Sequence, residues 1–499
     1  MKSCRNRRQL ETLEQKLQFK TTKEWNMRLT ANARSGNLQG ALDMPRDMRT
    51  AGVAPDVITY NRLLKACERH WRKALPLLER MRGEGIDPDV FSYNAAIAAC
   101  EKGEKWKEAL SLFRQLRDAG VRPDVITYNA TISACEKGKQ WEKALSLLDE
   151  MRGEGIHPDV ITFNATISAC EKGGQWEKAL ALLEQMLGEG IEPDVFTYSA
   201  AISACEKGGQ WEKALSLLGQ MRDAGIQPNV ISYSATISAC EKGGQWKKAL
   251  SLFSEMRRAS VQPDVIIYNA TISACEKGGQ WEKALALLEQ MRGVGMKPDV
   301  ITYSAVILAC VKGGQWKKAR LWFGKMRELG IPPNEITYAA AIQACASTGQ
   351  PAVALKIFDE AQRNIEVNRI TYNAILDAVC TSHPTEAREL YRRGFSLYGP
   401  VEGTENGAPK LDLHNHSEGA SETVVRWWLE ERVPAMTPEP EQLVFVTGWG
   451  RSRSALQDGD LHWRVKDLLA ELRVPTLPTK NPGMLLVDAQ AWLGQEAYS

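Results

Sequence analysis

Apolar residues recur along most of this chain with a helical spacing, and the same arrangement repeats every 35 residues. In residues 125–159, Tyr128, Ile132 and Cys135 follow i, i+4 and i+7 spacing, and a second apolar run extends from Trp141 to Met151. Both patterns are typical of amphipathic α-helices. Glycine and proline interrupt the pattern after each run, so each unit is predicted to fold as an antiparallel pair of helices.

Ten such units follow one another, and a helix pair of this size has to stack on its neighbours to bury its apolar face. The units begin at Thr22, Val57, Val90, Val125, Val160, Val195, Val230, Val265, Val300 and Glu335. One slot holds tryptophan at Trp71, Trp106, Trp141, Trp176, Trp211, Trp246, Trp281 and Trp316. An eleventh unit, from Arg369, keeps its first helix and decays after Cys380. The predicted fold is an all-α superhelical solenoid of 35-residue helix-turn-helix repeats.

The 35-residue period ends near residue 400, where the composition changes. Strands are expected at 410–414, 443–446 and 484–488, with helices at 418–431 and 461–472, which is the pattern of a small α/β domain. The expected organisation is an N-terminal lead-in at 1–21, a solenoid at 22–400, a linker at 401–409 and the α/β domain at 410–499.

Composition narrows the class of protein without naming a partner. A hydrophobic fraction of 43% and a charged fraction of 25% are those of a soluble folded protein. No apolar stretch approaches the roughly 20 residues that a membrane span needs. The formal net charge is only +2, so any nucleic-acid site must come from the local placement of charge. The basic N-terminus lacks the apolar core of a secretory signal, and it is either the stub of a targeting segment or a helical lead-in.

Most of the 11 cysteines hold one slot of the repeat. They are Cys67, Cys100, Cys135, Cys170, Cys205, Cys240, Cys275, Cys310 and Cys345, with Cys380 one residue later in its unit. No two are spaced as C-x-x-C, which argues against a zinc site. Buried free thiols are expected instead.

The units share terminal motifs. Each begins with a run close to V-[IF]-T-Y-N and ends with one close to G-[IV]-x-P-[DN]. These motifs resemble the pentatricopeptide repeat, and the resemblance covers residues 22–400. It implies a protein that binds single-stranded RNA, with one base contacted by each repeat and the repeats running N- to C-terminal along RNA from 5′ to 3′.

Ile126, Asn129 and Ser133 follow i, i+3 and i+7 spacing on the helix face opposite the apolar one, so they are expected to line a groove. The Asn129 amide can both donate and accept hydrogen bonds, which suits the edge of a base, and Ile126 with Ile161 could hold that base between them. In the family that this chain resembles, the last residue of the repeat, here Asp159, is the second specificity residue. Asp and Asn are also good helix N-caps, and capping is compatible with base recognition.

This pair of positions varies among a few polar combinations. Asn with Asp occurs at Asn26 with Asp56, Asn61 with Asp89, Asn94 with Asp124, Asn129 with Asp159, Asn164 with Asp194, and Asn269 with Asp299. Ser with Asn occurs at Ser199 with Asn229 and at Ser304 with Asn334. Ser234 is combined with Asp264, and Ala339 with Asn368. The family's code assigns U to Asn with Asp, A to Ser with Asn, and G to Ser with Asp. The implied ligand is 5′-UUUUUAGUA-3′, with the Ala339 repeat undecoded.

A lysine recurs at the end of the first helix, where it suits the negative end of the helix dipole. These lysines are Lys102, Lys137, Lys172, Lys207, Lys242, Lys277 and Lys312. The family resemblance implies a phosphate contact for each. Seven such contacts would make log K against log salt fall with a slope of roughly −5.

Near the C-terminus, the segments LDLHNHS (411–417), TGWGRS (447–452) and NPG (481–483) resemble an Smr domain, apart from Asn415, where glycine is usual. The resemblance implies a compact α/β sandwich, and members of that family include endonucleases. Asp412 and His414 are expected to leave one strand face as a general acid–base pair, with Arg451 facing a phosphate. A purely structural hydrogen bond between Asp412 and His414 is the alternative.

The sequence therefore predicts a sequence-specific binder of single-stranded RNA, acting in RNA processing, stability or expression in a chloroplast or mitochondrion by family resemblance. The alternative is a site-specific RNA endonuclease that cleaves with its Smr-like domain, and a protein-interaction scaffold is a third possibility. RNA binding needs no cofactor, whereas a nuclease could use a divalent metal, although no full set of metal ligands is apparent. We expect a monomer with no membrane contact.

Overall fold

The computed structural model describes residues 21–398, 401–405, 407–447, 458–479, 481 and 483–496. The chain divides into two compact units, residues 1–243 with 254–262, and residues 244–253 with 263–499. The predicted lead-in, apart from Thr21, lies outside the described residues. No helix of the described residues is long and apolar enough to cross a membrane.

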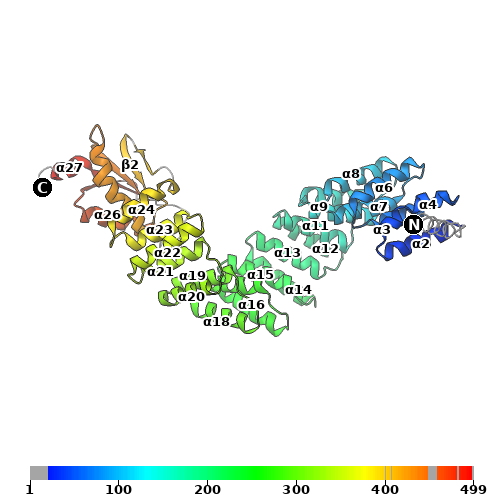
Figure 1. Ribbon diagram of the computed structural model, residues 1–499, viewed down its shortest axis with the longest axis horizontal. Helices are drawn as coiled ribbons and strands as arrows, with labels where there is room; N and C mark the ends of the chain where they lie inside the picture. The colour runs from blue at the N-terminus through cyan, green and yellow to red at the C-terminus, as the bar shows by residue number, and fades with distance from the viewer. Residues whose placement is uncertain are drawn as a thin grey trace, which may run out of the picture. The chain divides into compact units, whose positions relative to one another are not determined.

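The first unit consists of consecutive helix pairs, as the 35-residue pattern predicts (Figure 1). The first helices of these pairs are α2 (Thr22–Arg34), α5 (Val57–Ala66), α7 (Val90–Lys102), α9 (Val125–Lys137), α11 (Val160–Lys172), α13 (Val195–Lys207) and α15 (Val230–Lys242). The second helices are α6 (Trp71–Gly83), α8 (Trp106–Asp118), α10 (Trp141–Gly153), α12 (Trp176–Gly188) and α14 (Trp211–Asp223). In the first pair the second helix is split into α3 (Leu38–Leu42) and α4 (Met44–Thr50), where Pro45 occupies the first turn of α4.

The second unit continues the same pattern. Its helices are α17 (Val265–Lys277), α18 (Trp281–Gly293), α19 (Val300–Lys312), α20 (Trp316–Glu328), α21 (Glu335–Ala346), α22 (Pro351–Asn364), α23 (Arg369–Val379) and α24 (Pro384–Gly394), while α16 (Trp246–Arg258) spans the division between the units. The eleventh repeat is thus a complete helix pair, because α24 forms where the repeat motif fades.

Each first helix from α5 onward begins directly after the last residue of the preceding repeat. Asp159 has extended backbone, and its side chain accepts a hydrogen bond from the backbone N–H of Thr162, which caps the N-terminus of α11. Neighbouring first helices pack directly against one another, as α9 does against both α7 and α11. Tyr128, Ile132 and Cys135 are fully buried there, as their spacing predicts. Capping and packing therefore set the same phase in each repeat.

The repeated tryptophan packs against the next repeat. Gly173 ends α11, and a Cβ atom at this glycine would lie 2.3 Å from Cδ1 of Trp141. The Lys178 ammonium lies over the Trp141 ring, 5.1 Å from its centroid. Glycine is thus required at the end of the first helix because the indole of the previous repeat occupies the space of a side chain. This contact explains why tryptophan and glycine share the 35-residue period.

The cysteines confirm the prediction of packed free thiols. Cys67 through Cys345 in the repeated slot are free and buried, and Cys380 is partly exposed. Burial raises the pKa of Cys135 to about 11 and that of Cys100 to about 12, because the interior disfavours the thiolate. These thiols fill space between helices and are protected from reaction.

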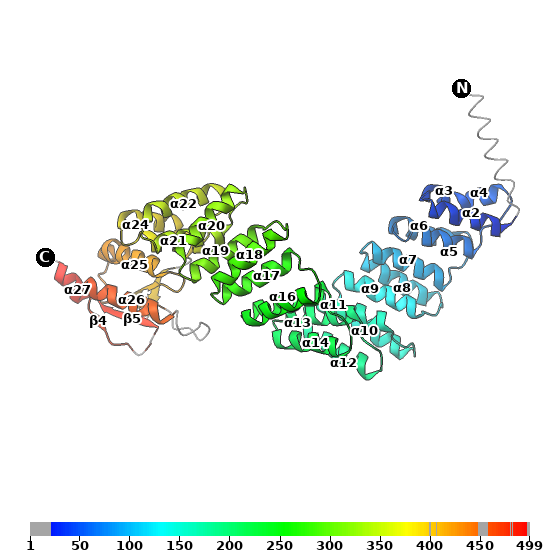
Figure 2. The same cartoon turned by 90° about the horizontal axis from the view of Figure 1, so that it is seen from below.

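The C-terminal region forms a five-stranded mixed sheet in the order β1-β2-β3-β5-β4. The strands are β1 (Glu402–Glu405), β2 (Ala408–Asp412), β3 (Gln442–Val446), β4 (Thr476–Leu477) and β5 (Met484–Asp488). Strand β2 runs parallel to β3, and the other neighbours are antiparallel. The accompanying helices are α25 (Glu418–Trp427), α26 (Asp458–Glu471) and α27 (Ala489–Glu496) (Figure 2).

The segment expected to be a linker is part of this sheet. Strand β1 lies within residues 401–409 and pairs antiparallel with β2, so the linker assignment is corrected. The polar, glycine-containing composition of the segment reflects a tight hairpin at an exposed sheet edge, with Gly407 at a positive φ of 86°.

The C-terminal sheet region is joined closely to the last helix pair. Helix α25 packs against both α23 and α24. The backbone N–H of Gly419 donates to the Asp377 carboxylate at 2.7 Å, and the Asn373 side chain donates to the carbonyl of Asn415 at 3.2 Å. Arg388 and Arg392 of α24 form ion pairs with Glu430 and Glu431. In this way α25 takes the place that the first helix of a further repeat would occupy.

Candidate nucleic-acid interface

The second residue of nearly every first helix is a large apolar side chain exposed to solvent. Ile126, for example, is 60% exposed, although isoleucine is normally buried. The equivalent residues in the first unit are Ile58, Phe91, Ile126, Ile161, Phe196 and Ile231, and those in the second are Ile266, Ile301, Ile336 and Ile370. Exposed apolar side chains repeated at a fixed interval have no structural explanation in the fold and indicate a binding surface.

Asn129 lies below this exposed row, between two repeats. Its Nδ2 donates to Oδ1 of Asp159 at 3.0 Å, and its Oδ1 accepts from the Thr162 hydroxyl at 2.6 Å. Asn129 is only 8% exposed, so most of its side chain is covered and only a small part can face the expected groove. The spacing placed it on the correct helix face, but the next repeat closes over it. Asn129, Asp159 and Thr162 form one hydrogen-bonded unit, named here the Asn–Asp–Thr unit.

The same pairing of amide and carboxylate recurs in both halves of the chain. The Asn side chain donates to the Asp carboxylate at 3.0–3.1 Å in four further repeats and at 3.5 Å in the first one. The four are Asn61 with Asp89, Asn94 with Asp124, Asn164 with Asp194, and Asn269 with Asp299, and the first repeat pairs Asn26 with Asp56.

The aspartates that end the repeats are not the open carboxylates that a simple base-contacting role would require. Each is partly buried, and its Oδ1 accepts a hydrogen bond of 2.8–2.9 Å from the backbone N–H of the third residue in the next helix. These residues are Asp56, Asp89, Asp124, Asp194, Asp264 and Asp299, which all behave as Asp159 does. Helix capping, which the sequence left open beside base recognition, occupies one oxygen of each of these carboxylates. Any contact with a base has to use the remaining lone pairs.

The combination of Ser234 and Asp264 lacks the hydroxyl of the Asn–Asp–Thr unit. Asp264 caps α17 by accepting from the backbone N–H of Ile267 at 2.9 Å, and Ile267 stands in the slot that Thr162 occupies in its own repeat. The single hydroxyl proton of Thr162 is shared between Oδ1 of Asn129 at 2.6 Å and Oδ1 of Asp159 at 2.9 Å, and the fully buried Ile267 offers Asp264 no such proton. Asp264 thus retains more acceptor capacity than Asp159.

The Ser/Asn combinations have a different arrangement of hydrogen bonds. The Ser199 hydroxyl is 3.4 Å from Oδ1 of Asn229, and that same Oδ1 caps the next helix by accepting from the Ser232 backbone N–H at 2.9 Å. Ser304 also lies 3.4 Å from Oδ1 of Asn334, but its hydroxyl is closer to the Val300 carbonyl and the Thr337 hydroxyl, both at 2.6 Å. Within the described part of the chain, no acceptor meets the Nδ2 groups of the two asparagines. The last residue of these repeats therefore presents N–H donors where Asp159 presents a carboxylate.

A cavity of about 460 Å³ connects these polar units to the exposed row. Asn164 and Ser199 both line it, together with Ile161, Phe196 and Ile231. The polar side chains of two successive repeats are thus accessible from a space bordered by exposed apolar side chains. This geometry suits flat ligands with hydrogen-bonding edges, which enter between apolar side chains and meet polar groups at their edge.

Six of the recurring lysines form ion pairs with a glutamate of the preceding repeat. The ammonium of Lys172 lies 2.7 Å from a carboxylate oxygen of Glu136 in the preceding repeat. The same pairing joins Lys102 to Glu68, Lys137 to Glu101, Lys207 to Glu171, Lys242 to Glu206 and Lys312 to Glu276. A phosphate contact at these lysines requires an exchange of partners. The slope of roughly −5 stays a prediction, and uptake of cations by the released glutamates would make it shallower.

The candidate catalytic residues lie at the carboxyl end of β2. Nδ1 of His414 and Oδ1 of Asp412 are 2.6 Å apart, and His414 is well exposed. Strand β2 ends at Asp412, so a turn, not a shared strand face, brings the two together. Arg451 and the glycine loop lie outside the described residues. Among the residues that are described, no group of three or more His, Cys, Asp or Glu side chains could hold a metal ion.

Family models match the chain over residues 23–364, well over half of its length. The model described as the PPR repeat family matches seven overlapping segments from 88 to 347, the pentatricopeptide repeat domain matches 23–69 and 46–103, and the PPR repeat matches 336–364. The chain belongs to the pentatricopeptide-repeat family. Pentatricopeptide-repeat proteins are sequence-specific RNA binders.

Solved structures of other pentatricopeptide-repeat proteins resemble the chain more loosely. PPR10 from maize is 23% identical, with 90% of this chain and 68% of that chain covered and a TM-score of 0.46. PPR10 in complex with an 18-nt psaJ RNA element is 19% identical, covers 91% and 85%, and has a TM-score of 0.39. The PPR domain of Arabidopsis thaliana PRORP1 in complex with tRNA is 21% identical, covers 34% and 90%, and has a TM-score of 0.32. No curated protein matches the chain.

Sequence reasoning missed two kinds of residue, one at this surface and one at the contact with the C-terminal region. Thr162 orients Asn129 and Asp159, and its signal was a hydroxyl at the third position of almost every first helix. Asn373 occupies the slot of Asn129, so nothing in the repeat pattern distinguishes its role. Its Oδ1 accepts from the Tyr398 hydroxyl at 2.8 Å, and its Nδ2 donates to the carbonyl of Asn415 in the C-terminal region. The same slot thus has different partners according to whether another repeat follows.

Proposed function

We propose that this protein binds single-stranded RNA with one base in each inter-repeat space, and that the Asn–Asp–Thr unit and its Ser/Asn counterpart select the base. The observation that carries the proposal is the recurrence of these units beneath exposed apolar side chains, with Asn164 and Ser199 lining one cavity between Ile161 and Ile231. Bases stack between the apolar side chains and point their edges at the polar units.

The Asn–Asp–Thr unit has the hydrogen-bonding capacity that uracil needs. In the arrangement with Asp159 and Thr162, Asn129 uses one of its two N–H groups and one acceptor site of its oxygen. One N–H remains for the O4 carbonyl of uracil, and acceptors remain for its N3–H. Adenine has a lone pair at N1, where uracil has N3–H, so the Asp159 carboxylate would repel it. Exclusion of the wrong base contributes to specificity together with attraction of the right one.

The Ser/Asn units exchange the donor and acceptor positions of the Asn–Asp–Thr unit. The Nδ2 group of Asn229 can donate to N1 of adenine, and the Ser199 hydroxyl can accept from its N6 amino group. The nine decoded repeats then select 5′-UUUUUAGUA-3′, with G at position seven assigned from the combination of Ser234 with Asp264 in the sequence. Guanine carries N–H donors at N1 and N2, which the acceptor-rich carboxylate of Asp264 can take up.

A filter-binding assay tests this function directly. Full-length protein should bind UUUUUAGUA at least about tenfold more tightly than a scrambled oligonucleotide of the same composition, because hydrogen-bond recognition of a base discriminates against a wrong one by roughly 1–3 kcal/mol. Equal affinity for the two RNAs would contradict sequence recognition. A monomer is expected by sedimentation in the complex, with one RNA for each chain.

A second proposal is that the C-terminal region, the candidate Smr-like domain, cleaves the bound RNA. The exposed Asp412–His414 pair at 2.6 Å supports it, because an accessible histidine held by a carboxylate can act as general base. Labelled RNA extending 3′ of the nine-base site is incubated with wild-type protein and with His414→Ala, with and without Mg²⁺. Cleavage by the wild type alone supports the nuclease, and identical RNA profiles refute it.

We further propose an organellar site of action, since pentatricopeptide-repeat proteins are typically organellar. Processing or stabilisation of a chloroplast or mitochondrial transcript would follow from selective binding to a site in it. Cell fractionation with an antibody against the protein tests this, and a purely cytosolic signal would contradict it.

A further inference from the structure

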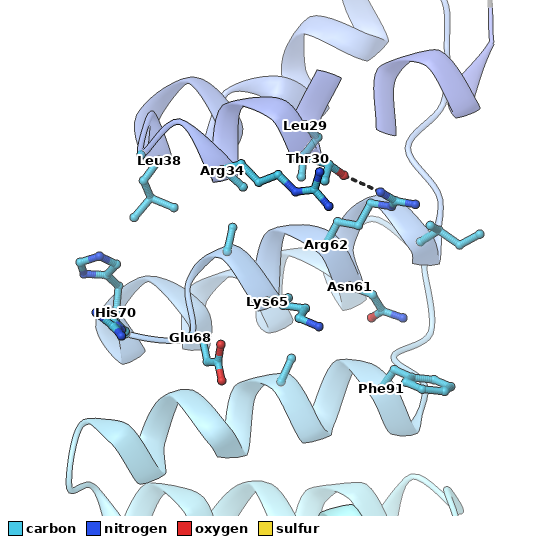
Figure 3. Close-up of a pocket in the computed structure, with 16 residues that line it drawn as sticks. Leu29, Thr30, Arg34, Leu38, Asn61, Arg62, Lys65, Glu68, His70 and Phe91 are labelled. Atoms are coloured by element: carbon cyan, nitrogen blue, oxygen red, sulfur yellow. Dashed lines mark hydrogen bonds between the residues drawn. The ribbon is translucent and has the colours of Figure 1, made fainter. Parts of the chain in front are cut away.

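The first two repeats enclose a cavity larger than the one that Asn164 and Ser199 line in later repeats. It measures about 990 Å³ and lies among α2, α5 and the start of α7. Arg34 of α2 and Arg62 and Lys65 of α5 extend toward the same space (Figure 3). The exposed apolar side chains Ile58 and Phe91, which belong to the base-stacking row, border it as well.

Two of the cations in this cavity, Arg62 and Lys65, are departures from the repeat. Arg62 occupies a slot that holds alanine in the later repeats, such as Ala130, and Lys65 occupies a slot that usually holds a small residue, such as Ser133. Two long cationic side chains thus replace small ones on the face that carries the Asn–Asp–Thr units. Arg62 is held in place by donating to Thr30 and to the backbone carbonyl of Asn26.

The neutralising glutamate is also missing here. Arg69 occupies the slot of the recurring lysine, but the preceding repeat has Ala33 where later repeats have glutamate. Glu68, the one carboxylate that lines the cavity, is paired with Lys102. Within the described part of the chain, Arg34, Arg62, Lys65 and Arg69 form no ion pair. The cavity therefore concentrates four cations without compensation, in a protein whose net charge is only +2.

We propose that this cavity, named here the N-terminal cationic pocket, binds the phosphates of the first two nucleotides of the RNA. The inference rests on the proposed function, in which repeats 1 and 2 hold the 5′ end of the site. The central lysines have to exchange a glutamate for a phosphate, whereas these cations are unpaired, so the main electrostatic attraction lies at the 5′ end. Guanidinium groups also suit phosphate through paired N–H donors.

The test variant is Arg62→Ala with Lys65→Ser, which converts repeat 2 to the residues of repeat 4 and so preserves its helix pattern. The affinity of the full-length protein is measured for three RNAs: UUUUUAGUA with a 5′ hydroxyl, the same RNA with a 5′ monophosphate, and UUUAGUA. The control variant is Arg122→Ala with Lys297→Ala, which removes the same charge from two exposed loop positions in other repeats.

We expect the pocket variant to bind the nine-base RNAs about tenfold more weakly at low salt, with the slope of log K against log salt reduced by about 1.4. Its affinity for UUUAGUA, which lacks the first two nucleotides, stays within twofold of wild type. If the pocket variant loses more affinity for the RNA with a 5′ monophosphate, the terminal phosphate is a ligand of the pocket. If it loses the same affinity for both nine-base RNAs, the ligand is the internal phosphate.

Equal losses for UUUAGUA and UUUUUAGUA, no loss at all, or the same loss in the control variant would overturn the proposal. Failure of the proposed function is separate, because it appears as equal binding of UUUUUAGUA and its scrambled form by the wild-type protein. Thermal unfolding monitored by circular dichroism excludes misfolding of the pocket variant, since a native melting curve is expected.

Discussion

Asn129 and Asn373 occupy the same slot of the repeat but have different partners. Asn129 is bound by Asp159 and Thr162 of the next repeat, which leave part of its amide available. Asn373 is followed by the C-terminal sheet region and is bound by Asn415 and Tyr398. The comparison shows that the repeat specifies where a polar side chain lies, while the following element decides which partners it has.

Breaking the contact between the last repeat and α25 should have the largest effect on stability. A Cβ atom at Gly419 would lie 2.6 Å from Cα of Asp377 and 2.8 Å from the carbonyl oxygen of Leu376, and backbone atoms cannot move aside easily. Gly419→Ala should destabilise docking of α25 by about 3 kcal/mol. Hydrogen exchange of the α25 amides measures this, and affinity for UUUUUAGUA should stay within twofold.

Gly403→Ala is the matched control, because the nearest atom to a Cβ there is the end of the Lys410 side chain at 3.6 Å. Unchanged protection of α25 in Gly419→Ala would show that the last repeat and the C-terminal region are not joined as described.

Removing the amide from each of the two slots separates the two roles. Asn129→Ala should weaken RNA binding by about 1–3 kcal/mol, because the base at position four loses its partner and Asp159 loses a donor. Asn373→Ala should leave RNA affinity unchanged and increase hydrogen exchange in α25. Binding isotherms and hydrogen exchange on both variants check this, and a loss of RNA affinity in Asn373→Ala would contradict the distinction.

Two titrations should act in opposite directions on the docking free energy of α25 on acidification, each by about 1 kcal/mol. Burial raises the pKa of Asp377 to about 6, so its contribution to docking is present at low pH and lost as pH rises through 6. Burial lowers the pKa of His416 to about 4, so its contribution is present above pH 6.5 and lost as pH falls toward 4. Between pH 7 and 5 the two largely cancel.

Asp377→Asn removes one side of this balance. Docking of α25 should then weaken on going from pH 7 to 5, as hydrogen exchange would show, while the wild type changes little. A variant that is as insensitive to pH as the wild type would exclude His416 as an acid-sensitive group in the docked region.

The sequence predicted the helix pairs, their phase and the buried cysteines, because period, caps and apolar spacing all act within a few residues. It failed where the outcome depends on a neighbour distant in sequence. The burial of Asn129 under the next repeat, the pairing of Lys172 with Glu136 and the engagement of Asn373 by Asn415 all depend on contacts across more than 30 residues. The hairpin at residues 402–412 was missed because polar strand edges and linkers share a composition.

Exchanging the base-selecting residues of one repeat tests the central claim most directly. In Ser199→Asn with Asn229→Asp, repeat 6 acquires the Asn–Asp pair that the other repeats place opposite uracil, and Ser232 can act as the hydroxyl partner as Ser92 does for Asn61 in repeat 2. Selection of RNA from a random pool should change the sixth letter from A to U and leave the other eight letters unchanged. A preference that stays at A, or that spreads to neighbouring positions, would contradict one-base-per-repeat recognition by these side chains.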